Sequence, residues 1–546
     1  MKRLLLLFVA ATVQAQTNYY PFRLGSTGTD YGKDLAVDSQ GNIILAGYFT
    51  GTVDFDPGPA TNNLTSAGNV DNFLAKYDSQ SKLLWAFRYG SAGVDIPHSV
   101  SVDSVGNIYV AGYFSNTCDF DPGPGTANLV SAGGRDVYIA KYSADGNFVW
   151  VRGFGASSDD QALDVTVDSA GNVAIVGFFS GTVDVDPGPD VVNLTSTGTT
   201  DGFVVKYDPN GNLLWAFRLG STSGHQNVGI TRDADDNLFV SGFFNTTVNF
   251  NPLGTPVNLT SAGAQDIFAA KYSASGTNLW AIRAGGTQPD LAIPGGIWLD
   301  AATNIHICGN FRGTADFDPG PGTANRTSAG DSDVFVAKYS ASGAYVWAVS
   351  FGGTLGDNGH RLCVDAAGYV LVTGWYGSTA DFDPGAGVYN LTTTGTDGAL
   401  EPYLAKFDVN GNLAWARGIG CTADGTNSWS LGTCIAPDGL GNFIATGRFF
   451  GTGTFGTLGT NTVTLTSAGD ADVFVAKFDG AGNLIDPLPT LQITQQGADF
   501  VLTWPGRAML QQTSDLVSNW TDMVTATSPH AITNPASRQL FFRLKR

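Results

Sequence analysis

Residues 71–77 read Asp-Asn-Phe-Leu-Ala-Lys-Tyr, and close copies of this heptad recur along the chain. The spacing between copies is 65 residues three times and then 67, 68 and 71. Self-similarity at a fixed period is the signature of a repeat architecture. The longer spacings predict that insertions occur only late in the repeat region, around residues 395–399 and 421–431. The copies place their lysines at Lys76, Lys141, Lys206, Lys271, Lys338, Lys406 and Lys477, and six are followed nine residues later by Trp85, Trp150, Trp215, Trp280, Trp347 and Trp415.

Each period is expected to form four short strands. In the first copy, apolar patterning predicts strands over residues 34–37, 43–49, 72–78 and 83–88. Turns such as Asp-Pro-Asn-Gly-Asn at 208–212 join them, because glycine supplies the positive φ that tight hairpin turns require. Four antiparallel strands at a fixed period predict propeller blades, and one long loop accounts for the length of each repeat.

The two ends of the repeat region complete each other. The seventh copy lacks its last strand, since Asp486 and Pro487 stand where a Trp is expected. Residues 20–25, Tyr-Pro-Phe-Arg-Leu-Gly, match Trp-Ala-Phe-Arg-Tyr-Gly at 85–90. We therefore predict an all-β fold over residues 16–487, a closed seven-bladed β-propeller of four-stranded blades. The N-terminal strand completes the last blade and removes two exposed sheet edges.

The chain ends differ from the repeats. Residues 1–15 are predicted to be a signal peptide, because Lys2 and Arg3 precede an apolar run and a small-residue cleavage motif follows it. We expect a secreted or cell-surface protein, and no later stretch is long and apolar enough to span a bilayer. Residues 488–546 predict a small separate β module, with strand patterns at 491–494, 500–504, 508–511 and 541–544.

The repeats resemble the bacterial seven-bladed propeller repeat family labelled SBBP. The likeness rests on Val-Asp-Phe-Asp-Pro-Gly at 53–58, Asn-Leu-Thr-Ser-Ala-Gly at 63–68 and the heptad at 266–272. It covers nearly all of residues 20–485 and implies an extracellular display or binding scaffold with no settled activity. The tail, with Leu-Thr-Trp-Pro at 502–505 and Phe-Phe-Arg-Leu at 541–544, resembles small β-sandwich modules that end some secreted bacterial proteins.

Net charge restricts the partners. The chain carries a formal charge of −20 and has a pI near 4.4, so nucleic acid and anionic membranes are poor partners. A protein or a glycan that binds an acidic surface is a better partner, and we expect the chain to be a monomer.

The motif Asp-x-Asp-Pro-Gly recurs in the long loop of five blades. Carboxylates at i and i+2 of an extended segment point the same way and could ligate Ca²⁺ together with backbone carbonyls. The alternative, which we favour, is that each Asp caps its own turn. In two blades the motif is replaced, by Asn249 and Asn251 in one and by Thr454-Phe455-Gly456 in the other. The motif residues are Asp54 and Asp56, Asp119 and Asp121, Asp184 and Asp186, Asp316 and Asp318, and Asp381 and Asp383.

A second set of acids lies in the connections between blades. These connections and the Asp-x-Asp loops are expected to open on one face, which would be strongly acidic and would bind the ligand. The set comprises Asp30, Asp95, Asp160, Asp290, Asp357 and Asp424. Cations beside the Trp row, Arg23, Arg88, Arg218 and Arg283, are expected to pair with carboxylates.

Five cysteines are too few and too widely spaced for a disulfide framework or a zinc site. Cys421 and Cys434 flank one interblade connection and could form a disulfide, whereas Cys308 and Cys363 lie in strand patterns and are expected to be buried. His98 and His360 occupy equivalent places at the start of the innermost strand and could face the channel.

Three functions remain open. The first is a non-catalytic binding or display scaffold, with or without calcium, which is favoured because acids copied into equivalent places have equivalent surroundings, unlike a catalytic pair. The second is a carbohydrate-binding or carbohydrate-active protein, since pairs such as Tyr48 and Phe49 could stack on sugars, although they are expected to be core. The third is a structural envelope component. A catalytic site, if present, is expected at the insertion around Cys421–Cys434.

Overall fold

The computed structural model describes residues 20–485 apart from 396–398, 423–428 and 457–461, and beyond them the strands of the C-terminal module. The signal peptide predicted at 1–15 lies outside the described residues. Contacts define a compact unit over Tyr20–Ile485. Among the described residues there is no helix of a length and hydrophobicity suited to crossing a membrane.

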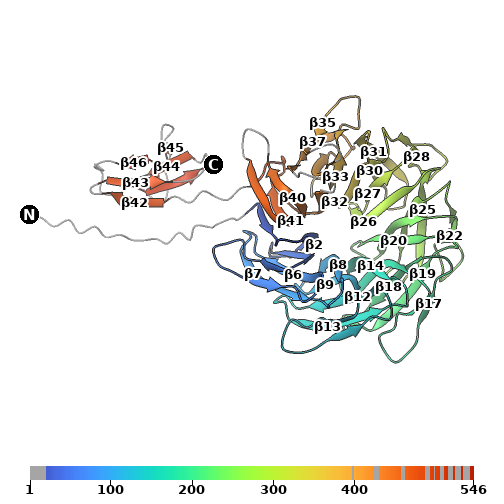
Figure 1. The fold of residues 1–546 in the computed structure, drawn as a ribbon. Coiled ribbons are helices and arrows are strands. Elements are labelled where there is room, and N and C mark those ends of the chain that lie inside the picture. The colour runs from blue at the N-terminus through green and yellow to red at the C-terminus, as the bar shows by residue number, and fades with distance from the viewer. Residues whose placement is uncertain are drawn as a thin grey trace, which may run out of the picture. The chain divides into compact units, whose positions relative to one another are not determined.

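Seven four-stranded antiparallel sheets surround a central channel (Figure 1). In six of these sheets the strands follow in chain order from the channel outward, as predicted. Blade 1 contains β2 (Tyr31–Val37), β3 (Ile43–Phe49), β6 (Asp71–Tyr77) and β7 (Leu83–Tyr89). The next five blades are β8 (Ile96–Val102), β9 (Ile108–Phe114), β12 (Asp136–Tyr142), β13 (Phe148–Phe154); β14 (Gln161–Val167), β15 (Val173–Phe179), β18 (Asp201–Tyr207), β19 (Leu213–Leu219); β20 (His225–Arg232), β21 (Leu238–Phe244), β24 (Asp266–Tyr272), β25 (Asn278–Gly286); β26 (Asp290–Leu299), β27 (Ile305–Phe311), β30 (Asp333–Tyr339), β31 (Tyr345–Gly353); and β32 (Asn358–Val364), β33 (Val370–Gly377), β36 (Leu400–Phe407), β37 (Leu413–Gly418).

Blade 7 is assembled from both ends of the repeat region. It contains β39 (Leu431–Pro437), β40 (Phe443–Phe455), β41 (Val463–Phe478) and, as its outer strand, β1 (Phe22–Leu24). Phe22 pairs with Val475 and Leu24 with Val473, so the predicted closure is confirmed. Arg23 donates to Asp472 at 2.5 Å, as Arg88 does to Asp71 at 3.1 Å in blade 1. Closure therefore reproduces the side-chain contacts of an uninterrupted blade.

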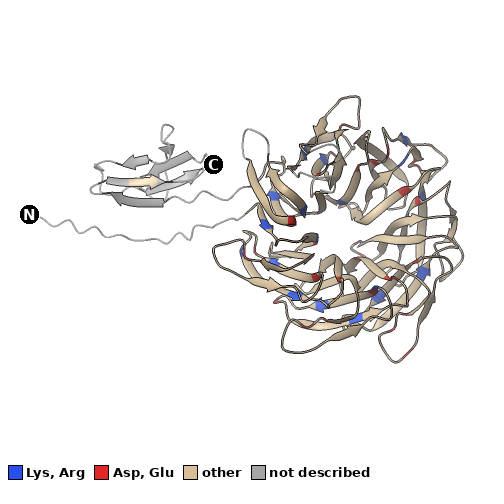
Figure 2. Ribbon diagram, viewed as in Figure 1, with Lys and Arg blue, Asp and Glu red and all other residues tan. Residues whose placement is uncertain are grey.

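The repeated lysines and tryptophans connect neighbouring blades. Lys76 Nζ and Trp85 Nε1 both donate to the carbonyl of Ala144 in the next blade, at 3.1 and 3.3 Å. Lys76 also pairs with Asp38 at the end of the innermost strand, 3.0 Å away. Lys477 of blade 7 donates to the carbonyl of Ser79 in blade 1 at 3.5 Å. Lysine and arginine positions accordingly recur around the ring (Figure 2).

The long loop of six blades folds into a further hairpin, and in blades 2, 5 and 6 this hairpin pairs with the end of the preceding blade. In blade 1 this hairpin is β4 (Thr52–Asp54) and β5 (Asn63–Thr65). Gly90, at the end of blade 1, bridges to Asp119 in the hairpin of blade 2, and Gly285 pairs with Asp316 in the same way. The others are β10 (Thr117–Asp119) with β11 (Asn128–Val130), β16 (Thr182–Asp184) with β17 (Asn193–Thr195), β22 (Thr247–Asn249) with β23 (Asn258–Thr260), β28 (Thr314–Asp316) with β29 (Asn325–Thr327), and β34 (Thr379–Asp381) with β35 (Asn390–Thr392), while β38 (Gly420–Cys421) pairs with the end of β40.

The C-terminal module forms two three-stranded antiparallel sheets, in agreement with the strands predicted from its sequence. One has the order β42 (Gln492–Gln496), β43 (Asp499–Thr503), β46 (His530–Ile532). The other has the order β45 (Thr521–Asp522), β44 (Met509–Thr513), β47 (Phe541–Lys545).

Candidate binding site in the central channel

The first aspartate of each Asp-x-Asp motif caps the hairpin turn. Asp54 Oδ1 accepts hydrogen bonds from the backbone N–H of Asp56, at 3.1 Å, and of Asn62, at 2.8 Å. One carboxylate oxygen thus binds both ends of the turn. The same two bonds recur at Asp119, Asp184, Asp316 and Asp381.

The second aspartate of each motif caps the Pro-Gly segment that follows it. Asp56 Oδ1 accepts from Gly58 N at 2.7 Å. The equivalent bonds run from Gly123 N to Asp121 at 2.8 Å, from Gly188 N to Asp186 at 2.7 Å, from Gly320 N to Asp318 at 2.8 Å and from Gly385 N to Asp383 at 2.8 Å.

The structure gives no support to the role of these ten residues as calcium ligands. In the described part of the chain, no three His, Cys, Asp or Glu side chains gather closely enough to hold a metal ion. The blade that lacks the acid also keeps the turn, since Asn249 Oδ1 accepts from Asn251 N and Val257 N, both at 3.0 Å. A neutral amide oxygen therefore replaces the carboxylate, which favours turn capping. Calcium binding stays a prediction for Asp54, Asp56, Asp119, Asp121, Asp184, Asp186, Asp316, Asp318, Asp381 and Asp383.

The interblade aspartates do not form an acidic face, and that part of the prediction is wrong. Asp30, Asp95, Asp160, Asp290 and Asp357 are at most 1 % exposed, and Asp424 lies outside the described residues. Asp160 accepts from Ala156 N at 2.6 Å and Ser180 N at 2.8 Å, so it fixes the connection against the second strand of its own blade. Burial raises the pKa of Asp30, Asp290 and Asp357 to about 7, although backbone N–H donors oppose the shift.

The predicted disulfide between Cys421 and Cys434 is also wrong, because both are free buried thiols. Cys421 pairs with Gly453 and Cys434 with Thr446 on the same strand, β40. Seven residues of strand separate these partners by about 20 Å, far beyond the roughly 7 Å between α-carbons that a disulfide spans. Cys308 and Cys363 are buried as predicted.

The two members of each aromatic pair differ in burial. Phe49 and its counterparts are buried between blades, which confirms the core prediction for them. Tyr48, Phe178, Phe243 and Trp375 are only partly buried.

The innermost strand of every blade carries a β-bulge. In six blades the bulge adds one residue, as at Lys33 between Gly32 and Asp34. In blade 5 it holds four residues, Ile293 to Gly296, opposite the single Cys308. This insertion falls within the first spacing longer than 65 residues, so the expectation that insertions occur only from residue 395 onward is wrong. Bulges re-aim side chains, and here they do so at the channel wall.

Three charged residues next to the bulges meet across the channel. Arg361 of blade 6 lies 3.4 Å from Asp34 of blade 1 and 4.0 Å from Asp164 of blade 3. Asp34 also accepts from Val100 N, and Asp164 from Ile230 N and Ser99 Oγ. We call Asp34, Asp164 and Arg361 the ion layer. These contacts connect blades 1, 2, 3, 4 and 6. Burial raises the pKa of Asp164 to about 6, although the nearby Arg361 opposes the shift.

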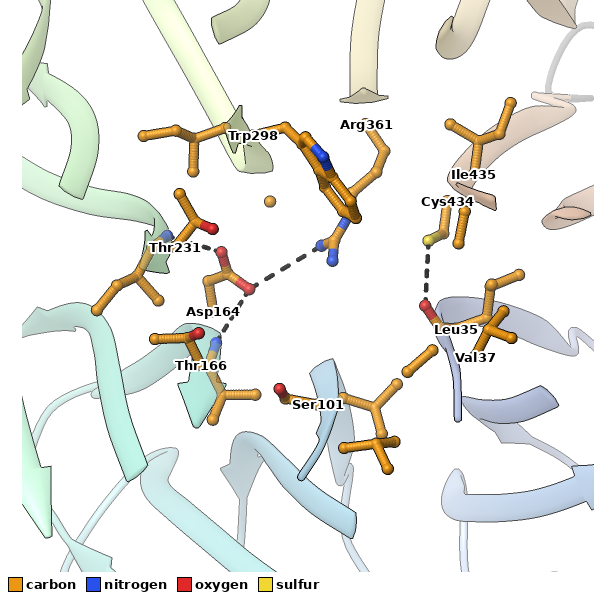
Figure 3. A pocket seen from close by; sticks show the side chains of 18 of the residues that line it. Leu35, Val37, Ser101, Asp164, Thr166, Thr231, Trp298, Arg361, Cys434 and Ile435 are labelled. Carbon is orange, nitrogen blue, oxygen red and sulfur yellow. Dashed lines mark hydrogen bonds and ion pairs between the residues drawn. The ribbon is translucent and has the colours of Figure 1, made fainter. Parts of the chain in front are cut away.

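A cavity of about 350 Å³, which we call the chamber, fills the channel on the side of the ion layer where the innermost strands end. Figure 3 shows Trp298 and Arg361 pointing into it. Trp298 stands where the other blades have small residues, namely Ala36, Ser101, Thr166, Thr231, Cys363 and Ala436.

The chamber offers unused hydrogen-bonding groups. Ser101, Thr166 and Thr231 are partly exposed on its wall. Neither their hydroxyls nor the indole N–H of Trp298 has a partner among the described residues. The volume falls within the range of small-molecule sites, roughly 300–1,000 Å³, and such sites combine an apolar wall with a few polar groups. The chamber can therefore hold a small polar ligand against an indole ring.

Comparisons agree with this architecture. Residues 84–113 match the family model described as "SBBP: Beta-propeller repeat". One stretch of the seven-bladed ring, from the last strand of blade 1 to the second strand of blade 2, is thus similar to this repeat.

Two relatives are similar in sequence. A WD repeat-containing protein from Acanthamoeba polyphaga mimivirus, described as uncharacterized, is 25 % identical over 472 residues, covering 72 % of this chain and 34 % of the relative. The regulatory protein FlaEY of Caulobacter vibrioides is 27 % identical over 269 residues, covering 46 % and 27 %. The chain thus spans about a third of the length of the curated relatives it matches. One relative is viral, so the matches do not tie the repeat to bacteria.

Two solved structures match at 10 % identity. A protein of unknown function from Bacteroides caccae covers 60 % of this chain and 94 % of its own, with a TM-score of 0.30. Sqt1 of Saccharomyces cerevisiae covers 83 % and 97 %, with a TM-score of 0.35. Neither likeness is close enough to bear on function.

Proposed function

We propose that this chain is an exported, non-catalytic binding propeller whose chamber receives a small polar ligand. One observation carries the proposal. The repeated polar residues are hydrogen-bonded into the fold, whereas the residues around the chamber differ from blade to blade. Trp298, which stands among small counterparts, is the clearest case.

The chemistry of the ion layer supports binding without catalysis. Each of its two aspartates already accepts backbone N–H donors and faces Arg361. A general base needs a free lone pair within reach of a proton on the substrate. The layer instead fixes the channel wall and presents polar atoms at one end of the chamber. The names of the two relatives, a repeat-containing protein and a regulatory protein, do not describe enzymes.

Export rests on the N-terminal sequence and belongs to the same proposal. The acidic hairpins, of which Asp54 and Asp184 are exposed, provide the alternative binding surface, with or without calcium.

The test is a screen of small polar compounds, including mono- and disaccharides, by ligand-observed NMR against the mature protein. Compounds that bind are then measured with Trp298→Ala and with Trp429→Ala, the latter removing a tryptophan that is 52 % exposed. The proposal predicts at least tenfold weaker binding to the first variant and unchanged binding to the second. Equal affinity for both variants, with loss of binding after Asp-to-Asn changes in the hairpins, would place the site on the acidic hairpins.

A further inference from the structure

On the other side of the ion layer, where the innermost strands begin, the channel is lined differently. The bulge position holds Lys33 in blade 1, His98 in blade 2 and His360 in blade 6, whereas Leu163 and Val228 occupy it in blades 3 and 4. Blades 6, 7, 1 and 2 are consecutive around the closed ring, and Thr433 holds this position in blade 7. Three of these four blades therefore carry a titratable group at a position that is apolar in blades 3 and 4.

Aromatic rings and an arginine complete this cluster. Lys33 Nζ lies 4.9 Å from the centre of the Tyr31 ring, and Arg448 Cζ of blade 7 lies 4.7 Å from the same ring. Tyr48 packs edge-on against Tyr31, with ring centres 5.5 Å apart. His98 lies 5.6 Å from Tyr113 in its own blade. We call Tyr31, Lys33, Tyr48, His98, Tyr113, His360 and Arg448 the basic mouth.

The two cations of the basic mouth lack a direct ion-pair partner among the described residues, although the charge of the neighbouring Asp34 acts on Lys33. Lys33 and Arg448 form no ion pair with a carboxylate in the described part of the chain, in a protein whose net charge is −20. Burial, with Arg448 nearby, lowers the pKa of Lys33 to about 8. Burial also lowers the pKa of His360 to about 3, with contributions from Lys33 and Arg448. At neutral pH the mouth thus presents two cations and two neutral imidazoles.

Two buried polar atoms of the innermost strands lack a hydrogen-bond partner in the described part of the chain. His98 Nε2 has no hydrogen-bond partner among the described residues, and neither has Oδ1 of Asn358, the blade 6 counterpart of Tyr31. Buried polar groups in native proteins are normally hydrogen-bonded, so orphaned atoms at a channel mouth point to a missing ligand or ordered water. The ring nitrogen at His98, which lies close enough to Lys33 to feel its charge, suits a hydroxyl group.

We propose that the basic mouth binds an acidic sugar, a uronate or a sulfated residue of a glycan. The anionic group would bind Lys33 and Arg448, a sugar hydroxyl would reach His98, and the apolar face of the sugar ring would pack on a tyrosine. Two cations can balance the single negative charge that an acidic sugar carries. The negative charge of the whole protein disfavours densely charged polymers such as nucleic acid. This site is separate from the chamber, so it does not depend on the function proposed above.

The test is isothermal titration calorimetry of the full chain with four probes at low salt. These are a galacturonate oligosaccharide, a sulfated oligosaccharide, a neutral glucose oligosaccharide and a glutamate hexapeptide, with sodium sulfate titrated alone as a fifth arm. We expect binding of one or both acidic oligosaccharides and at least tenfold weaker binding of the neutral one. Equal binding of neutral and acidic sugars would overturn the proposal. Tighter binding of the peptide would replace the sugar with an acidic protein segment, and binding of sulfate alone as tightly as the sugars would reduce the mouth to a simple anion site.

Variants locate the site. Lys33→Gln with Arg448→Gln should weaken acidic-sugar binding at least tenfold, while Trp298→Ala in the chamber should leave it unchanged. Arg417→Gln is the matched control, because Arg417 also lies over an aromatic ring, Trp415 at 5.7 Å, and has no ion pair among the described residues. Unchanged affinity of a folded double variant would show that the sugar binds elsewhere.

Discussion

Replacing Arg361 with Met should destabilise the propeller more than any surface arginine change. The Arg361 side chain is 15 % exposed, and Asp34 and Asp164 are 1 % and 4 % exposed. Met keeps most of the packing volume but leaves two buried carboxylates without a counter-charge. Breaking a buried ion pair by removing one partner costs about 3–5 kcal/mol.

This cost converts to a modest shift of the melting temperature because the domain is large. An unfolding entropy of about 2.1 cal/mol/K per residue gives about 1 kcal/mol/K for the 466 residues of Tyr20–Ile485. The Arg361→Met variant should therefore melt about 3–5 °C lower in differential scanning calorimetry at pH 7.5. At pH 5 the loss should be smaller, because the pKa of Asp164, already raised by burial to about 6, rises further without Arg361 and the carboxyl becomes neutral.

The control is Arg312→Met. Arg312 lies 2.6 Å from Asp331, a shorter distance than in the ion layer, but the two side chains are 46 % and 54 % exposed. Exposed pairs contribute about 0–1 kcal/mol, so this variant should melt within about 1 °C of the wild type. Adding Asp164→Asn to Arg361→Met should recover part of the loss. The reasoning is refuted if Arg361→Met and Arg312→Met shift the melting temperature equally.

Three further predictions concern the repeated residues. Burial raises the pKa of the interblade aspartates Asp30, Asp290 and Asp357 to about 7, so the folded protein binds more protons than the unfolded chain between about pH 4 and 7. The stability that these protons contribute is fully present below pH 4 and is lost as the pH rises through 7. The urea midpoint should therefore fall from pH 5 to pH 8, and Asp290→Asn should make that fall smaller. Turn capping predicts that Asp54→Asn lowers the melting temperature by less than 1 °C. It also predicts the same melting temperature in EDTA and in millimolar CaCl₂, whereas a clearly higher melting temperature in CaCl₂ would establish the calcium alternative. All five cysteines should be alkylated after unfolding without a reductant, as mass spectrometry can check, and a pair resistant to alkylation would contradict the structure.

Much of the fold is predictable because each blade repeats the same local chemistry. The register of the heptad, the positive-φ turns and the match between residues 20–25 and 85–90 each specify a strand pairing that the structure contains. The pairing of Arg88 with Asp71, and its copies, is predictable for the same reason.

The site is harder to predict because repetition itself suggests function. The interblade aspartates, copied in most blades, suggest a binding face, yet they are buried and accept backbone N–H donors that the sequence does not reveal. Asp160, for example, accepts from Ala156 N and Ser180 N. The informative signal is departure from the repeat, as at Trp298 or Lys33, and aligning the innermost strands reveals both positions. The bulges that aim these residues, and the closeness of Lys33 to His98 and His360 across blades, follow only from the closed ring.

The central claim is that binding resides in the channel, where the blades differ, and not in the repeated acidic loops. The most direct test compares the affinity of a chamber ligand for three proteins: wild type, Trp298→Ala, and a variant in which Asp54, Asp119, Asp184, Asp316 and Asp381 are all Asn. Our account predicts that the Trp298 variant loses at least tenfold in affinity while the five-loop variant binds as the wild type does. Loss of binding in the five-loop variant alone, with its fold intact, would contradict the account.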